Sequence, residues 1–139
     1  MSMFLSTLVI EDNKTIFELI KRKFKNCTLN EMVNLIPAGS LKEAKIIAQI
    51  KTFDIIMLDL NLPDSRGLHT IKKVNTIFTI PIVIFSSMDY DMNLSLQCMK
   101  EGAQDVIPKD IFIPEEIYSR LCFAKLRYDQ KKQFVPHLI

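Results

Sequence analysis

The sequence predicts an α/β domain in which a five-stranded parallel sheet is covered by helices on both faces. Five short apolar runs alternate along the chain with five longer segments whose apolar residues recur at helical spacing. The short runs are continuously apolar rather than alternating, which is the pattern of strands buried on both faces of a parallel sheet. Because crossovers between parallel strands are right-handed, this order predicts a doubly wound architecture.

Several of the expected elements are bounded by informative residues. Ser40, with Glu43 three residues later, has the capping-box pattern that starts a helix. Gly102 stands where a helix C-terminal cap is expected, and Pro114 opens the last helix with Glu115 in its first turn. The expected strands cover residues 8–10, 32–36, 55–58, 80–85 and 105–107, and the expected helices cover residues 16–24, 41–48, 68–78, 92–100 and the segment from 114 onward.

Composition and charge narrow the possible classes of function. The chain has 139 residues, 48% of them apolar and 24% charged, which fits a globular domain with one core. A formal net charge of only +2 gives no argument for binding to nucleic acid or to a membrane. Apolar runs fall far short of the ~20 residues of a membrane span, and the N-terminus lacks a signal-peptide pattern. Together with three separated cysteines, Cys27, Cys98 and Cys122, which favour reduced thiols, this predicts a cytoplasmic protein.

Polar side chains follow four of the expected strands at the point where each strand ends. In an open α/β sheet, ligands bind beyond the carboxyl ends of the strands, near the switch in strand order. Taken alone, a polar residue at the end of a strand would be an ordinary loop residue or, in the case of Asp12 or Asn13, a helix N-cap. The simultaneous placement of such residues at the carboxyl ends of several strands is what indicates a functional site. The residues are Glu11 and Asp12 after the first strand, Asp59 and Asn61 after the third, Ser86 at the end of the fourth, and Lys109 after the fifth.

These residue types point to phosphoryl chemistry assisted by a metal ion. Three neighbouring carboxylates repel one another, and a bound cation is the natural way to neutralise them. Oxygen ligands without histidine or cysteine favour Mg²⁺ or Mn²⁺ over zinc. An ammonium and a hydroxyl beside the metal suit the remaining oxygens of a phosphoryl group. A carboxylate held there can act as a nucleophile and become an aspartyl phosphate.

With these residues in place, the sequence resembles the receiver domains of response regulators in two-component signalling, over residues from about 7 to 127. The matching segments are VIED at 9–12, DIIMLDLNLPD at 54–64 with Gly67, PIVIFSS at 81–87, and GAQD at 102–105 ahead of Lys109. Any one segment is weakly specific, but four in order at the family's spacing are strongly specific. The segment at 54–64, with a proline and a glycine after Asp59, is the most specific of them.

The resemblance implies a phosphorylation switch with the flavodoxin-like receiver fold and strand order 2-1-3-4-5. Asp59 would accept a phosphoryl group from a histidine kinase or a histidine phosphotransfer protein, and Ser86 and Lys109 would contact that group. The domain would catalyse only its own phosphorylation and dephosphorylation, and would act on a downstream effector or a fused output domain. The ligands implied for Mg²⁺, with Mn²⁺ as a substitute, are Glu11, Asp12, Asp59 and the backbone carbonyl of Asn61.

Three positions depart from the family pattern. Asp110 stands where the family usually has proline, Val106 where it commonly has tyrosine or phenylalanine, and Ser87 where alanine or glycine is common. In the family, the ring at the position of Val106 moves inward on activation, and a short β-branched side chain cannot do so. We therefore expect the phosphorylation machinery to be intact, and the response to appear as backbone movement over residues 86–91.

The whole chain, residues 1–139, is expected to form a single receiver domain with its core over about 7–127. Residues 128–139 would be the end of the last helix or the start of a linker, since so short a segment cannot hold an output domain. Basic residues in the last helix, such as Arg127 and Lys131, resemble those of helices that lead into a further signalling domain. They also simply suit the helix dipole.

Three other classes of function share part of this pattern. A receiver-fold interaction module that works without phosphorylation would explain the unusual switch positions, although the complete acidic site argues against it. A phosphatase of the haloacid dehalogenase type needs an Asp-x-Asp pattern, and Asn61 replaces its second aspartate here. A flavodoxin-like cofactor binder needs a phosphate-binding loop after the first strand, where Glu11 and Asp12 would repel a phosphate. Only the first alternative stays open.

Overall fold

The computed structural model describes residues 3–86, 91–110 and 112–134. Within them, five strands and five helices alternate strictly, as the sequence predicts. Among the described residues, no helix combines the length and apolar character that crossing a membrane requires. The elements are β1 (Leu5–Ile10), α1 (Lys14–Lys25), β2 (Val33–Ala38), α2 (Leu41–Ala48), β3 (Ile55–Leu58), α3 (His69–Ile77), β4 (Ile82–Ser86), α4 (Met92–Lys100), β5 (Asp105–Pro108) and α5 (Pro114–Phe134).

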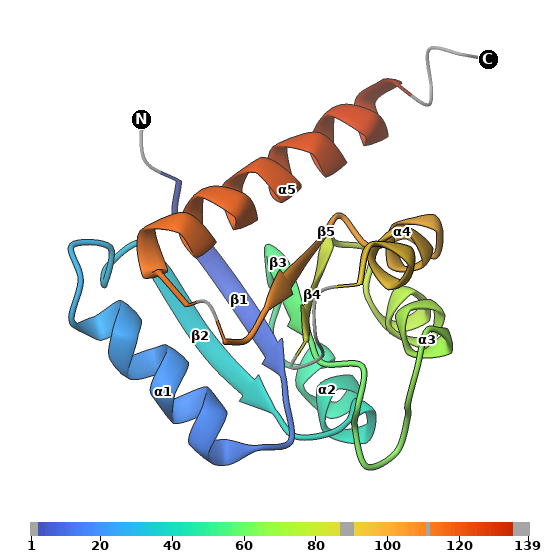
Figure 1. Ribbon diagram of the computed structural model, residues 1–139, viewed down its shortest axis with the longest axis horizontal. Helices are drawn as coiled ribbons and strands as arrows, with labels where there is room; N and C mark the ends of the chain where they lie inside the picture. The colour runs from blue at the N-terminus through green and yellow to red at the C-terminus, as the bar shows by residue number, and fades with distance from the viewer. Residues whose placement is uncertain (1–2, 87–90, 111, 135–139) are drawn as a thin grey trace.

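The strands form one parallel sheet in the order β2-β1-β3-β4-β5, which confirms the predicted topology. α1 and α5 cover one face of this sheet, and α2, α3 and α4 cover the other (Figure 1). The core beneath α1 and α5 contains Phe17, Ile20 and Leu121. The core beneath the other three helices contains Ala44 and Ile71. Helices on both faces of a parallel sheet define the doubly wound α/β fold.

The strands are buried on both faces, which explains their continuously apolar sequences. In β1, Leu8 and Ile10 belong to the core beneath α2, α3 and α4, whereas Val9 belongs to the core beneath α1 and α5. All four residues of β3 are fully buried. Because successive strand residues point to opposite faces, a strand covered twice needs apolar side chains at every position.

Several strand boundaries differ from the sequence prediction, and the largest differences are in β1 and β2. β1 begins at Leu5 rather than at residue 8, because two polar residues, one of them the fully buried Thr7, interrupt its apolar pattern. β2 continues through Pro37 to Ala38, although the prediction ended it at residue 36. β2 lies at the edge of the sheet and has a neighbouring strand on one side only. Proline, which has no backbone N–H, is tolerated at an edge because no hydrogen bond to a second neighbouring strand is lost.

The helix ends follow the predicted chemistry with one change. The Ser40 hydroxyl accepts a hydrogen bond from the Glu43 backbone N–H at 3.0 Å, as a capping box predicts. The Glu43 carboxylate accepts from the Gly39 N–H at 2.9 Å, however, rather than from Ser40. Gly102 follows α4 with a φ of 114°, a conformation that glycine adopts without strain.

The three cysteines are free, as expected. Cys98 is fully buried in the core beneath α2, α3 and α4, and Cys27 and Cys122 are half-buried beside the other core. Burial raises the pKa of the Cys98 thiol. This thiol therefore stays protonated and packs as a small apolar side chain.

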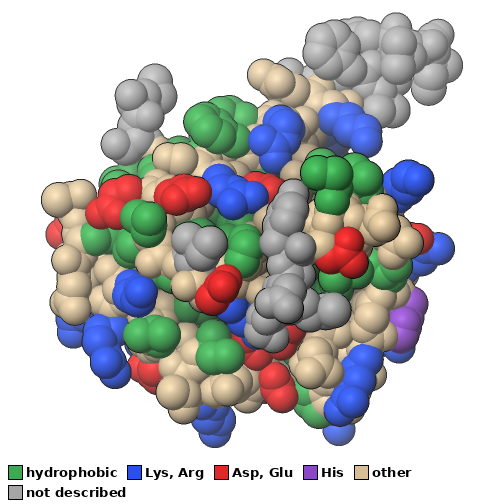
Figure 2. Space-filling view, viewed as in Figure 1, with side chains coloured by type: hydrophobic (Ala, Val, Ile, Leu, Met, Phe, Trp, Pro, Cys, Tyr) green, Lys and Arg blue, Asp and Glu red, His purple; other side chains and the backbone are tan. Residues whose placement is uncertain are grey.

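The visible surface carries charges of both signs. Figure 2 shows Lys and Arg side chains interspersed with Asp and Glu side chains, without a large area of one sign on that face. α5 is the longest helix, with 21 residues. Its C-terminal half extends beyond the sheet, away from the carboxyl ends of the strands (Figure 1).

Candidate functional site

The carboxyl ends of four strands bring the predicted site residues to one edge of the sheet. Glu11 follows β1, Asp59 follows β3, Ser86 ends β4, and Lys109 follows β5. Backbone hydrogen bonds continue the sheet past the strand ends and fix these positions. The Asp59 N–H donates to the Ile10 carbonyl at 3.0 Å, and the Lys109 N–H donates to the Ser86 carbonyl at 2.8 Å.

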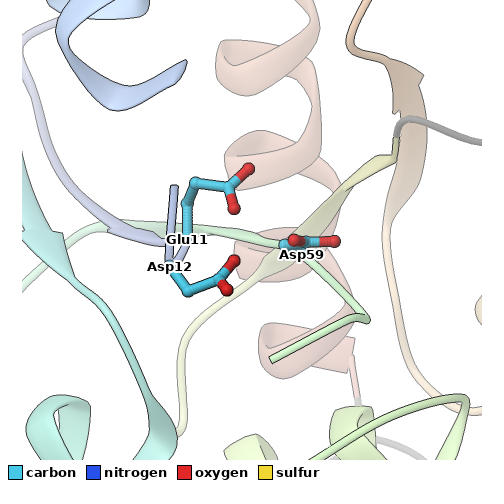
Figure 3. A group of neighbouring side chains, drawn as sticks. All are labelled: Glu11, Asp12 and Asp59. Carbon is cyan, nitrogen blue, oxygen red and sulfur yellow. The ribbon is translucent and has the colours of Figure 1, made fainter. Parts of the chain in front are cut away.

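Three carboxylates gather at the centre of this edge. Figure 3 shows Glu11 and Asp12 extending from the end of β1 toward Asp59, and ligand oxygens of all three lie within 4.8 Å of one another. Glu11 and Asp59 are buried, whereas Asp12 is exposed. Asn13 caps α1 through its Oδ1 atom, so Asp12 is not needed as the helix cap. Oxygen donors in this number and spacing fit Mg²⁺ or Mn²⁺, which prefer carboxylates and water.

Lys109 supplies the positive charge of this cluster. Its ammonium donates to the Glu11 carboxylate and lies 3.2 Å from Oδ2 of Asp59. The Lys109 side chain is only 9% exposed. It also lies over the ring of Phe85, 5.8 Å from the ring centroid. A buried ammonium between two buried carboxylates offsets part of their charge, because buried charges are tolerated when they are paired.

Glu11 shows that this compensation is incomplete. The pKa of its carboxyl group is raised from 4.5 to about 7, mainly by burial and also by the negative charge of Asp59, although the hydrogen bond from Lys109 lowers it. The protein therefore disfavours a second negative charge beside Asp59. A divalent cation would reverse this, because a nearby positive charge favours the ionised form of a carboxyl group.

Hydrogen bonds hold the loop after Asp59 in a fixed conformation. The Asn61 N–H donates to Oδ1 of Asp59 at 3.1 Å, and Asn61 forms an isolated antiparallel bridge with Arg66. At the base of the loop, the hydroxyls of Ser65 and Thr70 share a buried hydrogen bond of 2.7 Å. These hydrogen bonds hold the backbone of Asn61 beside the carboxylate cluster. The assignment of the Asn61 carbonyl as a metal ligand stays a prediction.

Asp64 ties the same loop to α2, a contact that the sequence did not indicate. Its two carboxylate oxygens accept from the backbone N–H groups of Leu41 and Lys42, each at 3.0 Å. These are the first two residues of α2, where N–H groups have no partner within the helix. Burial alone would raise the pKa of Asp64, but the two hydrogen bonds outweigh burial and lower it.

Replacing Asp64 with alanine should lower the free energy of unfolding by about 1 kcal/mol near neutral pH, because α2 loses two N-terminal hydrogen bonds. A group whose folded pKa is lowered contributes stability above its ordinary pKa and loses it as the pH falls through the folded value. Urea unfolding of D64A and wild type should therefore converge in acid, below pH 3.8. Asp110→Ala, which removes another exposed carboxylate, is the control. A pH-independent deficit would show that Asp64 does not stabilise α2 through its charge.

A hollow opens beside the loop that follows Asp59. Among the described residues, its lining includes Asp59, Asn61, Arg66, Ser86 and hydrophobic residues of α4 and the loop before α3. Ser86 is 8% exposed and faces this hollow from the end of β4. Arg66 did not emerge from the sequence, because a single arginine in a polar loop has no distinguishing pattern.

The unusual switch positions lie on β5 and the segments around it. Val106 is half-buried and packs against the core beneath α2, α3 and α4. Arg120 of α5 pairs with Asp105 at 2.8 Å and also donates to the Val106 carbonyl at 3.0 Å. Asp110 is exposed. Ser87 and most of the loop over 86–91, where movement was expected, lie outside the described residues.

The fold and this edge together define a doubly wound, flavodoxin-like domain with an oxygen-ligand site at the carboxyl ends of its strands. The sequence matches the response regulator receiver domain family over residues 7–121, and the chain belongs to this family. It is therefore a receiver domain of two-component signalling.

Individual relatives are distant. The chain is 27% identical over 122 residues to the response regulator protein GraR of Staphylococcus aureus, covering 86% of this chain and 49% of GraR. The chain thus spans about half the length of the curated relatives it matches. Its structure resembles the receiver domain of the Francisella response regulator 1452, with a TM-score of 0.70 and 26% identity over 88% of this chain and 98% of that one.

A further structural relative carries the modification that the sequence predicts here. It is a response regulator protein from Burkholderia pseudomallei with a phosphorylated aspartic acid, a calcium ion and citrate. The TM-score is 0.68 at 21% identity, with 91% of this chain and 72% of that chain covered. At this identity the likeness concerns the fold alone.

Proposed function

We propose that this domain is the phosphoacceptor switch of a two-component phosphorelay and that Asp59 accepts the phosphoryl group. The observation that supports this best is the placement of one buried carboxylate, Asp59, between two acidic neighbours and the ammonium of Lys109. The phosphorylated aspartic acid in the Burkholderia pseudomallei relative agrees with this assignment.

The proposed role of each side chain follows from its charge. Glu11, Asp12, Asp59 and the Asn61 carbonyl would hold Mg²⁺, which stabilises negative charge on the phosphoryl oxygens when it is bound. Lys109 would neutralise a phosphoryl oxygen from the opposite side, and the Ser86 hydroxyl, at the rim of the same hollow, would donate to another.

The donor would be a phosphohistidine on a histidine kinase or a histidine phosphotransfer protein, and the domain would act in the cytoplasm. The carboxylate of Asp59 would attack the phosphorus as the P–N bond breaks, and the histidine ring, which carries a proton on its other nitrogen, would leave as neutral imidazole with the electron pair of that bond. The domain would thus catalyse only its own phosphorylation and dephosphorylation. We propose that residues 1–139 form one receiver domain, acting on a downstream effector or an output domain.

Incubation with acetyl phosphate and Mg²⁺, followed by intact-mass analysis, tests this function. We expect a mass increase of one phosphoryl group on wild type, and none on Asp59→Asn, because an amide is not nucleophilic enough to accept it. The modification should disappear on standing, because acyl phosphates hydrolyse. A phosphoryl group retained by D59N would show that another residue is the acceptor.

The alternative function is an interaction module that works without phosphorylation. Val106 favours it, because a half-buried valine cannot rotate into a space vacated by Ser86 as an aromatic ring can. The contact from Arg120 to the Val106 carbonyl offers another route, because it links the backbone of β5 to α5. Amide exchange with and without beryllofluoride distinguishes the two functions, since a phosphorylation-independent module should show no change.

A further inference from the structure

Arg66 is a positively charged side chain in the acceptor loop that the site described so far does not use. It is exposed and lines the same hollow as Asp59 and Ser86. Its backbone is held in an antiparallel bridge with Asn61, two residues beyond Asp59. Among the described residues that line this hollow, Arg66 alone carries a positive charge.

The charge of Arg66 is not used within the described part of the chain. Its guanidinium forms no ion pair or hydrogen bond with any described residue, whereas that of Arg120 pairs with Asp105 at 2.8 Å. Lys109 is also committed, because its ammonium contacts two carboxylates of the cluster and lines a different hollow beside α1. The planar fork of donors on Arg66 therefore faces solvent beside the acceptor, in a geometry that matches phosphate oxygens.

We propose that Arg66 binds the anionic phosphoryl donor at Asp59 and gives the site a preference for dianionic donors, an inference that rests on the proposed function. A donor that approaches Asp59 brings negative charge toward three carboxylates. A guanidinium at the rim of the hollow offsets part of this repulsion and orients the phosphoryl oxygens. The effect is electrostatic, so it grows with the charge of the donor and falls with ionic strength.

Acetyl phosphate shows the chemistry involved. A carboxylate oxygen of Asp59 attacks the phosphorus and forms a new O–P bond, while the P–O bond to the acetyl group breaks. Acetate leaves with the electron pair of that bond, and no proton is transferred, because both carboxylates are ionised. The dianionic phosphoryl group keeps its charge throughout, and so keeps its attraction to Arg66.

The test compares phosphorylation rates with acetyl phosphate, a dianion, and phosphoramidate, which carries less negative charge. Arg66→Gln should slow the reaction with acetyl phosphate roughly fivefold at low salt, the upper end of what one exposed charge contact contributes. The loss should be smaller with phosphoramidate and should shrink at high salt. Arg66→Lys should retain most of the rate. Lys25→Gln, which removes the same charge at the C-terminal end of α1, near the start of β2, should behave as wild type.

The outcomes separate this inference from the proposed function. If wild type is phosphorylated and R66Q reacts at the wild-type rate with both donors, Arg66 does not have the proposed role, whereas the proposed function still holds. An equal loss with both donors at every salt concentration would also overturn it, because it would indicate a merely structural role. If neither donor phosphorylates wild type on Asp59, the proposed function fails and the inference fails with it. A donor-dependent, salt-dependent loss supports it.

Discussion

Replacing Lys109 with methionine should destabilise the metal-free domain by about 3 kcal/mol, because it leaves Glu11 and Asp59 buried without their cation. Methionine fills a similar volume, so the loss reports mainly the missing charge. The cost stays near the lower end of the range for broken buried pairs, because Glu11 can take up a proton. Urea unfolding measures it.

The pH dependence of this deficit follows from Glu11. Its pKa is already raised to about 7 with Lys109 present, and without the ammonium we expect it to rise further. A carboxyl group whose folded pKa is raised above its ordinary value contributes stability at low pH and loses it as the pH rises through the folded value. Below about pH 7, Glu11 is protonated in both folded proteins, so the deficit of K109M should stay roughly constant there and should widen as the pH rises above about 7.

Lys125→Met is the matched control. Lys125 forms a partly exposed pair with Asp129, four residues later on α5, at 3.0 Å. Losing such a pair should cost no more than about 0.5 kcal/mol. Equal destabilisation of K109M and K125M would show that Lys109 does not compensate a buried acidic cluster, and would remove the main electrostatic support for the site.

The sequence predicted the parts of the fold whose signal is local. β3 was placed correctly because every residue from Ile55 to Leu58 is buried and apolar, and a polar residue follows the strand. The start of β1 was missed because Thr7 is polar yet fully buried. The first residues of β1 belong to the strand because they pair with β2, and the sequence of β1 alone does not show this pairing.

The same distinction applies to the site. Glu11, Asp59 and Lys109 could be predicted to lie together because the carboxyl ends of parallel strands lie at the same end of the sheet. The order of the strands then determines which of these residues are neighbours. The contact of Asp64 with Leu41 could not be predicted, because it joins residues 23 positions apart through the path of an irregular loop. Strand geometry constrains direction and register, whereas loop side chains depend on contacts that only the folded chain creates.

Mg²⁺ at about one hundred times its dissociation constant should raise the free energy of unfolding by about 2.7 kcal/mol, because we expect it to bind only the folded cluster. Asp12→Ala should abolish most of this stabilisation. Asp12 is exposed, so its removal should change the metal-free stability by no more than about 0.5 kcal/mol. The loss of Mg²⁺ response would then be separable from a loss of folding, measured by thermal melts at constant ionic strength.

Asp110→Ala provides the control, because Asp110 is an exposed carboxylate next to Lys109 and lies outside the acidic cluster. D110A should keep the full response to Mg²⁺ and to Mn²⁺. A general screening effect of divalent ions on acidic side chains would stabilise wild type, D12A and D110A alike. That result, or a wild-type melting temperature unchanged by Mg²⁺, would mean that Glu11, Asp12 and Asp59 do not form a metal site, because three carboxylate ligands held this close should respond selectively to a divalent cation.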